Sequence, residues 1–360
     1  MTVTPAPMQT MFAGVDTHKD THHAAVIDAR GHHIADREFQ TGQTGDDQMC
    51  TWLAQWAIEQ IAVEQTGTYG AGLTRSLHAD GYRIKELNHP DLTVRAGHGK
   101  SDPVDAYMAA EAARTGRADV TPKDRTGIIE SIRMIKAARA SAVKSRTAAL
   151  SQIRDFTIVA PLRDKLAGLS TRQIVTVVLT WRPNRNDLAN PVQGAKLALR
   201  GVATRIRDLD AEINDYDTQL DTLTSQIAPT LKTLPQVGTM VAAQLLITVG
   251  QCPNRIHTDA QFARLCGIAP IPASSGKTHR MRLHRGGDRH ANSAIHLVAI
   301  GRLRQHEKAL AYRERRRTEG LSDKDIIRAM KRYIARELFH TLKTDLNSYD
   351  STPHKASPTP

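Results

Sequence analysis

Short apolar runs separated by turn residues fill the beginning of the chain, a pattern typical of strands. Three such runs between Met11 and Glu38 predict an antiparallel meander. Helical and strand patterns then alternate, and together with the meander they predict an α/β domain of the RNase H type. The elements expected after the meander are a helix near 47–60, a strand at 61–67, a helix near 70–79, a strand at 82–87 and a helix at Ser101–Gly116.

The middle of the chain is predicted to be helical. A stretch rich in Arg, Lys and Ala extends without proline from about Asp124 to Val159. A later segment, which Pro229 ends, has apolar residues at alternating steps of four and three. This pattern favours a coiled coil, within one chain or between chains, although an amphipathic helix packed on its own domain has the same spacing. The apolar positions are Val202, Ile206, Leu209, Ile213, Tyr216, Leu220, Leu223 and Ile227.

The last part of the chain begins with a turn and a helix at Leu234–Gly250, LPQVGTMVAAQLLITVG. The turn resembles that of a helix-hairpin-helix element, in which backbone N–H groups approach a phosphate. A helical hairpin buried in the core is an equally good interpretation. A final helix is expected at about Asp323–Leu342, and the tail at 346–360, rich in Pro, Ser and Thr, is expected to be disordered.

The charge balance points to a polyanionic partner. The 360 residues include 49 Lys and Arg against 37 Asp and Glu, which gives a formal net charge of +12. Nucleic acid is the commonest partner of such a protein, although a merely basic enzyme has the same balance. Because aromatic residues make up only 4% of the chain, phosphate contacts are expected to dominate binding, with base stacking secondary.

Cysteine usage and the lack of long apolar runs indicate the compartment. Three cysteines without a CxxC pair argue against a disulfide framework and a zinc ribbon, and fit a reducing cytoplasm. We expect a cytoplasmic protein with no membrane partner. The doublets His22-His23 and His32-His33 place neighbouring side chains on opposite strand faces, which argues against a shared metal and favours surface positions.

Four acidic residues stand at positions from which they could converge. Asp16 ends the first strand in GVDTHK, Glu64 lies near the end of a strand in AVEQTG, and Asp102 and Asp105 begin a helix. The spacing of three places the last two on one helix face. Each acid alone could be structural, with Asp102 as a helix cap and Asp16 as a turn residue. Together they predict a site for Mg²⁺, which prefers oxygen ligands and can act on phosphodiesters.

The motifs GVDTHKD, AVEQTGTYG and KSDPVDA together resemble the DEDD-type transposases of bacterial insertion sequences. These are serine-dependent, bridge-RNA-guided recombinases with a domain similar to RuvC, the Holliday-junction resolvase. The resemblance spans nearly the whole chain and places the family's acidic tetrad on Asp16, Glu64, Asp102 and Asp105. It implies a RuvC-like DEDD catalytic domain at 10–155, a helical coiled-coil dimerisation segment at 156–230, a mostly α transposase domain at 231–345 and a disordered tail at 346–360.

The segment GIAPIPASSGK resembles the family's segment that carries a catalytic serine just before glycine, which implies Ser275. Ser274 beside it leaves the assignment open. A serine hydroxyl needs activation, and nearby cations would stabilise charge on an attacked phosphate. From the local sequence alone, both serines could instead hydrogen-bond the backbone. The resemblance further implies a covalent phosphoserine, acidic and serine sites from different protomers of a dimer or tetramer, and a guide RNA. It also implies a bacterial protein that associates with the nucleoid.

Basic residues follow the serine and recur in the run Arg302–Arg317, where they are interpreted as phosphate contacts or as a solvated helical face. Three functions fit the whole pattern. They are a transposase, a metal-dependent junction-resolving nuclease that uses water, and a non-catalytic nucleic-acid-binding protein. The residues expected to contact DNA or RNA are Lys277, Arg280, Arg282, Arg285, Arg289, Arg315, Arg316 and Arg317.

Overall fold

The computed structural model divides the chain into two compact units, which are described separately. The first contains Met1–Arg125 and Gly250–Arg255, and the second contains Thr126–Val249 and Ile256–Pro360. The residues that the structure describes are 9–87, 101–123, 125–251, 255–274, 276, 281–284 and 286–351.

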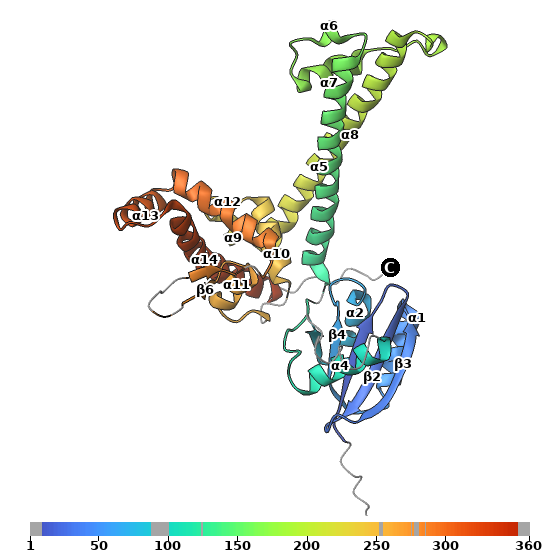
Figure 1. Cartoon of the computed structure of the whole chain (residues 1–360), viewed down its shortest axis with the longest axis vertical. Helices are drawn as coiled ribbons and strands as arrows, with labels where there is room; N and C mark the ends of the chain where they lie inside the picture. Colours follow the sequence, from blue (N-terminus) through green and yellow to red (C-terminus); the bar gives the residue numbers. More distant parts are fainter. Residues whose placement is uncertain are drawn as a thin grey trace, which may run out of the picture. The chain divides into compact units, whose positions relative to one another are not determined.

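A five-stranded mixed sheet forms the centre of the first unit (Figure 1). The strands are β1 (Met11–Thr17), β2 (Thr21–Asp28), β3 (His33–Gln40), β4 (Ile58–Glu64) and β5 (Ile84–Leu87). Their order in the sheet is β3-β2-β1-β4-β5; the first three strands are antiparallel, whereas β4 lies parallel to β1 and β5 parallel to β4. The predicted meander and the mixed α/β class are therefore confirmed.

Helices cover both faces of this sheet. Helices α1 (Gln43–Leu53) and α2 (Ala71–Ala79) bury apolar side chains against Ala13 and Val15 on one face. Helix α4 (Asp102–Arg114) packs its alanines against Ala62 on the other. Successive residues of a strand point to opposite faces, so β4 contributes Ile61 and Val63 to the first face and Ala62 to the second.

A long pair of helices begins the second unit. Helix α5 (Gly127–Val159) packs against α8 (Pro191–Ile227), and α6 (Arg163–Leu166), α7 (Thr171–Thr180) and the 3₁₀ turn η1 (Arg185–Asp187) connect them (Figure 1). The ion pairs Arg139–Asp217 and Arg146–Asp210 show that the two helices are antiparallel. The heptad seam on α8 therefore has a partner helix within the same chain.

The rest of the second unit is mostly helical and shares one apolar core. Helix α10, from the segment predicted as a helix-hairpin-helix element, is largely buried there. No helix among the described residues has the length and apolar content needed to cross a bilayer. The elements are α9 (Pro229–Thr233), α10 (Thr239–Val249), α11 (Asp259–Leu265), β6 (Pro270–Pro272), β7 (Met281–Leu283), α12 (Arg289–Gln305), α13 (Glu307–Thr318) and α14 (Asp323–Asp350).

Three expectations were wrong in part. The helix expected near 47–60 ends at Leu53, because the residues from Ile58 onward pair with β1 in the sheet. Helix α14 continues to Asp350 instead of giving way to a disordered tail at 346, because Leu346 extends its buried apolar stripe. His22 and His23 are buried, since β2 is an interior strand covered on both faces.

Candidate metal centre

Two of the four predicted acids lie at the ends of neighbouring parallel strands. Val15 of β1 pairs with Val63 of β4, so the residues that follow them, Asp16 and Glu64, come next to each other along the sheet. Both residues are buried, being 3% and 7% exposed. The hydroxyl of Thr17 donates a hydrogen bond of 3.0 Å to the carbonyl oxygen of Glu64, which ties the two strand ends together.

Helix α4 brings the other two acids to the same face of the sheet. It crosses β1 at Gly14, where a Cβ atom would lie 2.0 Å from the backbone nitrogen of Ala110 and 2.2 Å from the carbonyl oxygen of Ala106. Only glycine allows so close an approach. Gly14 and Asp16 are two residues apart on one strand and therefore point to this same face, where α4 begins with Asp102.

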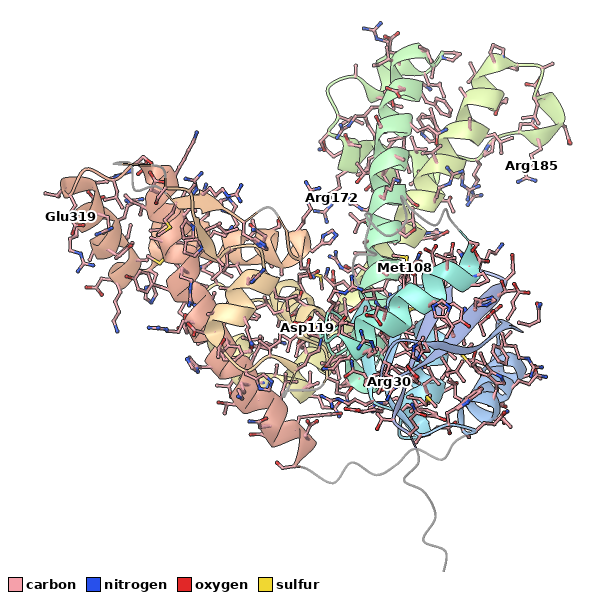
Figure 2. All side chains as sticks on the ribbon, turned by 60° about the horizontal axis from the view of Figure 1, so that its bottom comes forward. Arg30, Met108, Asp119, Arg172, Arg185 and Glu319 are labelled. Carbon is pink, nitrogen blue, oxygen red and sulfur yellow. The ribbon has the colours of Figure 1, made fainter. Side chains whose placement is uncertain are left out.

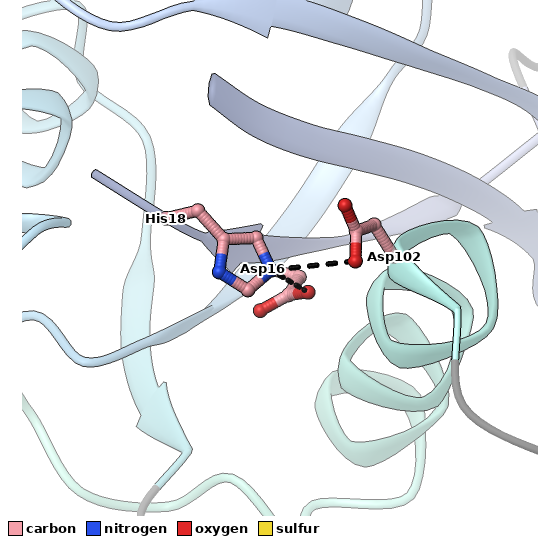
Figure 3. Close-up of side chains that lie close together, drawn as sticks. All are labelled: Asp16, His18 and Asp102. Atoms are coloured by element: carbon pink, nitrogen blue, oxygen red, sulfur yellow. Dashed lines mark hydrogen bonds and ion pairs between the residues drawn. The ribbon is translucent and has the colours of Figure 1, made fainter. Parts of the chain in front are cut away.

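The carboxylates of Asp16 and Asp102 meet at the imidazole of His18 (Figure 3). Nε2 of His18 lies 3.1 Å from Oδ2 of Asp16 and 3.4 Å from Oδ1 of Asp102. One ligand atom of each residue lies within 4.8 Å of the others, a spacing that can hold a metal ion. The side chain of Asp16 is 5% exposed and that of Asp102 is 42% exposed, so the group is open on the side of α4.

Burial and repulsion raise the pKa of Asp16 above its ordinary value. Burial contributes most, and the carboxylates of Asp105 and Asp102 add repulsion, while His18 acts in the opposite direction. Asp105 lies one turn along α4 from Asp102 and is itself 2% exposed. Like charges held this closely destabilise one another unless a cation joins them.

The donor set of this group fits a divalent metal. Carboxylate oxygens are preferred ligands of Mg²⁺, and Mn²⁺ accepts oxygen together with imidazole nitrogen. A cation would also relieve the repulsion that raises the pKa of Asp16. His18 was not predicted as a site residue because THKD was interpreted as a turn, although its spacing of two from Asp16 places it on the same side of the chain.

The predicted serine and several cations lie outside the described residues, namely Ser275, Lys277, Arg280 and Arg285. The chain from 273 to 280 joins the two strands of the hairpin formed by β6 and β7. Arg282 lies in β7 and Arg289 is the first residue of α12, and both are exposed.

The run Arg302–Arg317 contains one buried cation and several cations that form ion pairs at the surface. Arg302 is buried, donating to the carbonyl oxygen of Pro235 and pairing with Glu337, so it was wrongly assigned to a surface patch. Arg315 and Arg316 both pair with Glu319, which Figure 2 labels at the end of α13. Arg317 pairs with Glu314 and Asp323 at 3.2 and 2.9 Å.

Two family models match the chain, one in each half. Residues 13–157 match the DEDD transposase model of the IS110 type, and residues 228–314 match the transposase model of the IS116/IS110/IS902 family. Together they cover more than half of the chain. The first match contains Asp16, His18 and Asp102, and the second contains Ser275.

Curated relatives match along most of their length. The chain is 24% identical over 375 residues to the insertion element IS900 uncharacterized 42 kDa protein of Mycobacterium paratuberculosis, covering 90% of this chain and 93% of the relative. It is 24% identical over 391 residues to the insertion element IS110 uncharacterized 43.6 kDa protein of Streptomyces coelicolor, covering 95% and 96%. The chain therefore belongs to the DEDD-type IS110 family of transposases and is a DNA transposase or recombinase.

Proposed function

We propose that this transposase cuts and exchanges DNA strands through a divalent metal, Mg²⁺, and a nucleophilic serine, with a non-coding bridge RNA guiding it. The observation that supports the metal site most directly is the meeting of Asp16, His18 and Asp102 at the end of β1. Family membership supports the reaction class, since a transposase must break and rejoin DNA.

We further infer that the first unit has an RNase H fold similar to that of RuvC. Its strand order, with three antiparallel strands followed by β4 and β5 parallel to β1, supports this assignment. The division into a catalytic domain at 10–155, a helical segment at 156–230 and a transposase domain at 231–345 belongs to the same proposal.

The metal ligands in this proposal are Asp16, Glu64, Asp102 and Asp105. A bound Mg²⁺ would stabilise negative charge on the phosphate under attack. Asp16 and Asp102 supply oxygen atoms at the group that His18 joins, and Glu64 and Asp105 are buried next to them along the sheet and along α4. His18 would fix the orientation of the two carboxylates through the contacts of 3.1 and 3.4 Å.

The strand-transfer step is assigned to Ser275. Its hydroxyl oxygen bonds to a phosphorus of the DNA backbone, the bond from that phosphorus to one sugar oxygen breaks, and the serine proton ends on the sugar oxygen that leaves. A hydroxyl of the partner strand then attacks the phosphoserine, which restores the serine hydroxyl. Exposed arginines after the serine, including Arg282 and Arg289, would offset the charge on the phosphate.

The basic surface would serve DNA and guide RNA alike. The formal net charge of +12 supports phosphate contacts that do not depend on sequence. Assembly into a dimer or tetramer would bring the metal site of one protomer to the serine of another, as the family resemblance implies.

The test uses the full-length chain with guide RNA, Mg²⁺ and DNA that carries the element ends. Wild type should exchange strands and form a protein–DNA adduct that survives denaturing electrophoresis. Ser275→Ala should lose both, whereas Ser274→Ala should keep them. Asp102→Asn should bind DNA without cutting it, and Asp47→Asn, an exposed acid on α1, should behave like wild type. Cutting that persists in Ser275→Ala would favour a nuclease that uses water, and cutting by Asp102→Asn would exclude the metal site.

A further inference from the structure

A cavity of about 510 Å³ lies in the second unit, between the hairpin of β6 and β7 and helix α14. Pockets of about 300–1,000 Å³ take small organic molecules, so this one has room for one or two nucleotides of a single strand but not for a duplex. Its wall contains Met281, Arg282, Arg328, Arg332, Tyr333 and Arg336.

Cations dominate the wall of this cavity. Among the described residues that line it, Asp325 is the only acid, and it pairs with Arg328 at 2.9 Å. Asp259 of α11 holds Arg332 and Arg336 at 2.7 and 3.2 Å and so fixes the direction of two guanidinium groups. The side chains of Arg328 and Arg336 are mostly exposed, and such exposed pairs are weak enough for a phosphate to replace or join them.

Tyr333 adds a stacking surface beside these cations. It is 61% exposed although the chain is poor in aromatic residues, and its ring makes an edge contact with Tyr312 at a centroid distance of 5.7 Å. Met281, which also lines the cavity, is equally exposed. An aromatic ring held in place next to arginines is the usual arrangement for stacking one base while cations contact the phosphates.

Lys331 also lines the cavity, but it has a structural role that differs from that of the other cations. It is 7% exposed and donates a hydrogen bond to Oδ1 of Asn292 in α12. This bond joins α14 to α12 at the wall of the cavity.

We propose that this cavity binds a single-stranded segment of the DNA substrate, with a base on the ring of Tyr333 and phosphates on Arg328 and Arg336. The choice of DNA over RNA rests on the proposed function, because the chain that joins β6 to β7 contains Ser274 and Ser275. A strand in the cavity lies against the hairpin that carries the proposed nucleophile. In this proposal, the strand held in the cavity is the one that Ser275 attacks.

The test measures binding of a short fluorescent single-stranded DNA to the full-length chain by anisotropy, without guide RNA. Tyr333→Ala should weaken binding about tenfold, whereas Tyr333→Phe should keep it, because stacking needs only the ring. Arg328→Gln should reduce the slope of log affinity against log salt concentration by the amount that corresponds to about one phosphate contact. Lys343→Gln, at a partly exposed position about two turns of α14 beyond Arg336 and outside the residues that line the cavity, is the matched control and should have a smaller effect.

Binding unchanged in Tyr333→Ala would overturn the proposal. Circular dichroism of each variant separates a lost contact from a lost fold. If the alanine variant unfolds, Arg328→Gln decides the test, because an unchanged salt dependence of binding would then overturn the proposal. A matched single-stranded RNA that binds more tightly and depends more on Tyr333 would overturn the choice of DNA. The affinity is measured apart from any reaction, so an absent serine adduct would count against the proposed function and leave this result standing.

Discussion

Gly14 and Ala110 are in backbone contact: a Cβ atom on Gly14 would lie 2.0 Å from the backbone nitrogen of Ala110. Real Cβ atoms do not come this close to a backbone atom. The strand β1 and helix α4 therefore fit together only because position 14 lacks a side chain. Since α4 begins with Asp102 and β1 ends near Asp16, this contact sets the separation of the two carboxylates.

Gly14→Ala should displace α4 and separate the metal ligands. We expect it to reduce the free energy of unfolding by about 3 kcal/mol, at the upper end of overpacking effects, because the new methyl group meets backbone. Thermal unfolding and the binding of Mn²⁺ would measure the two effects. Gly72→Ala is the control, since a Cβ atom there would make only an ordinary contact, 3.7 Å from the Asp46 carboxylate. Equal stability of both variants would contradict the close packing of α4.

Asp16→Asn should stabilise the metal-free protein at neutral pH. The pKa of Asp16 is raised in the folded state, mainly by burial, so its charge costs folding free energy that asparagine avoids. Unfolding in a chelator should show this gain. As pH falls, Asp16 of wild type is protonated in the folded state before it is protonated in the unfolded state. The difference in the free energy of unfolding between variant and wild type should therefore shrink, and it should vanish below the ordinary pKa of 3.8. Added Mn²⁺ should then stabilise wild type more than the variant. A variant less stable than wild type in chelator would contradict this prediction.

The fold was predictable from local patterns, whereas the site needed long-range pairing. Short apolar runs separated by turn residues predicted the strands of the meander, and the Ser-Asp-Pro opening predicted α4. The approach of Asp16 to Asp102 depends on the register of β1 and on how deeply α4 packs at Gly14, neither of which leaves a local pattern. His18 was missed for this reason, because its role appears only once the helix is in place.

The helices of the second unit were likewise predictable only in part. The heptad spacing on α8 predicted a partner helix but could not say whether it belonged to the same chain. The structure shows α5 as that partner, with several seam residues buried. The end of α14 was missed because the Pro, Ser and Thr content of 346–360 favoured a disordered tail from residue 346. In the structure, Leu346 is buried, and Asp345 before it accepts a hydrogen bond of 2.8 Å from the backbone N–H of Leu231.

The pairing of Arg139 with Asp217 should stabilise the contact between α5 and α8. Nε and Nη2 of Arg139 lie 2.5 and 3.1 Å from the two carboxylate oxygens, a bidentate geometry. A double-mutant cycle with Arg139→Ala and Asp217→Ala, followed by urea unfolding, should give a coupling of about 0.5–1 kcal/mol, since the pair is partly exposed. Arg207 and Asp208, a pair of sequence neighbours on α8 alone, should give a smaller coupling. Equal couplings would argue against a role for Arg139 in joining the helices.

Asp288 should be a major stabilising residue of the second unit, because both of its carboxylate oxygens are used. Oδ1 caps α12 by accepting from the backbone N–H groups of His290 and Ala291 at 2.8 and 3.1 Å, and Oδ2 lies 2.6 Å from the buried hydroxyl of Thr248. Asp288→Ala removes the cap and deprives buried polar groups of an acceptor, so we expect the free energy of unfolding, measured by heat or urea, to fall by about 3 kcal/mol.

Two further variants test the separate contributions of the Asp288 carboxylate. Asp288→Asn keeps an acceptor for the cap and should reduce the free energy of unfolding less. Thr248→Val, which removes one hydroxyl, should lose about 1 kcal/mol. If all three variants unfold at the same temperature and urea concentration as wild type, the carboxylate of Asp288 does not join α12 to α10.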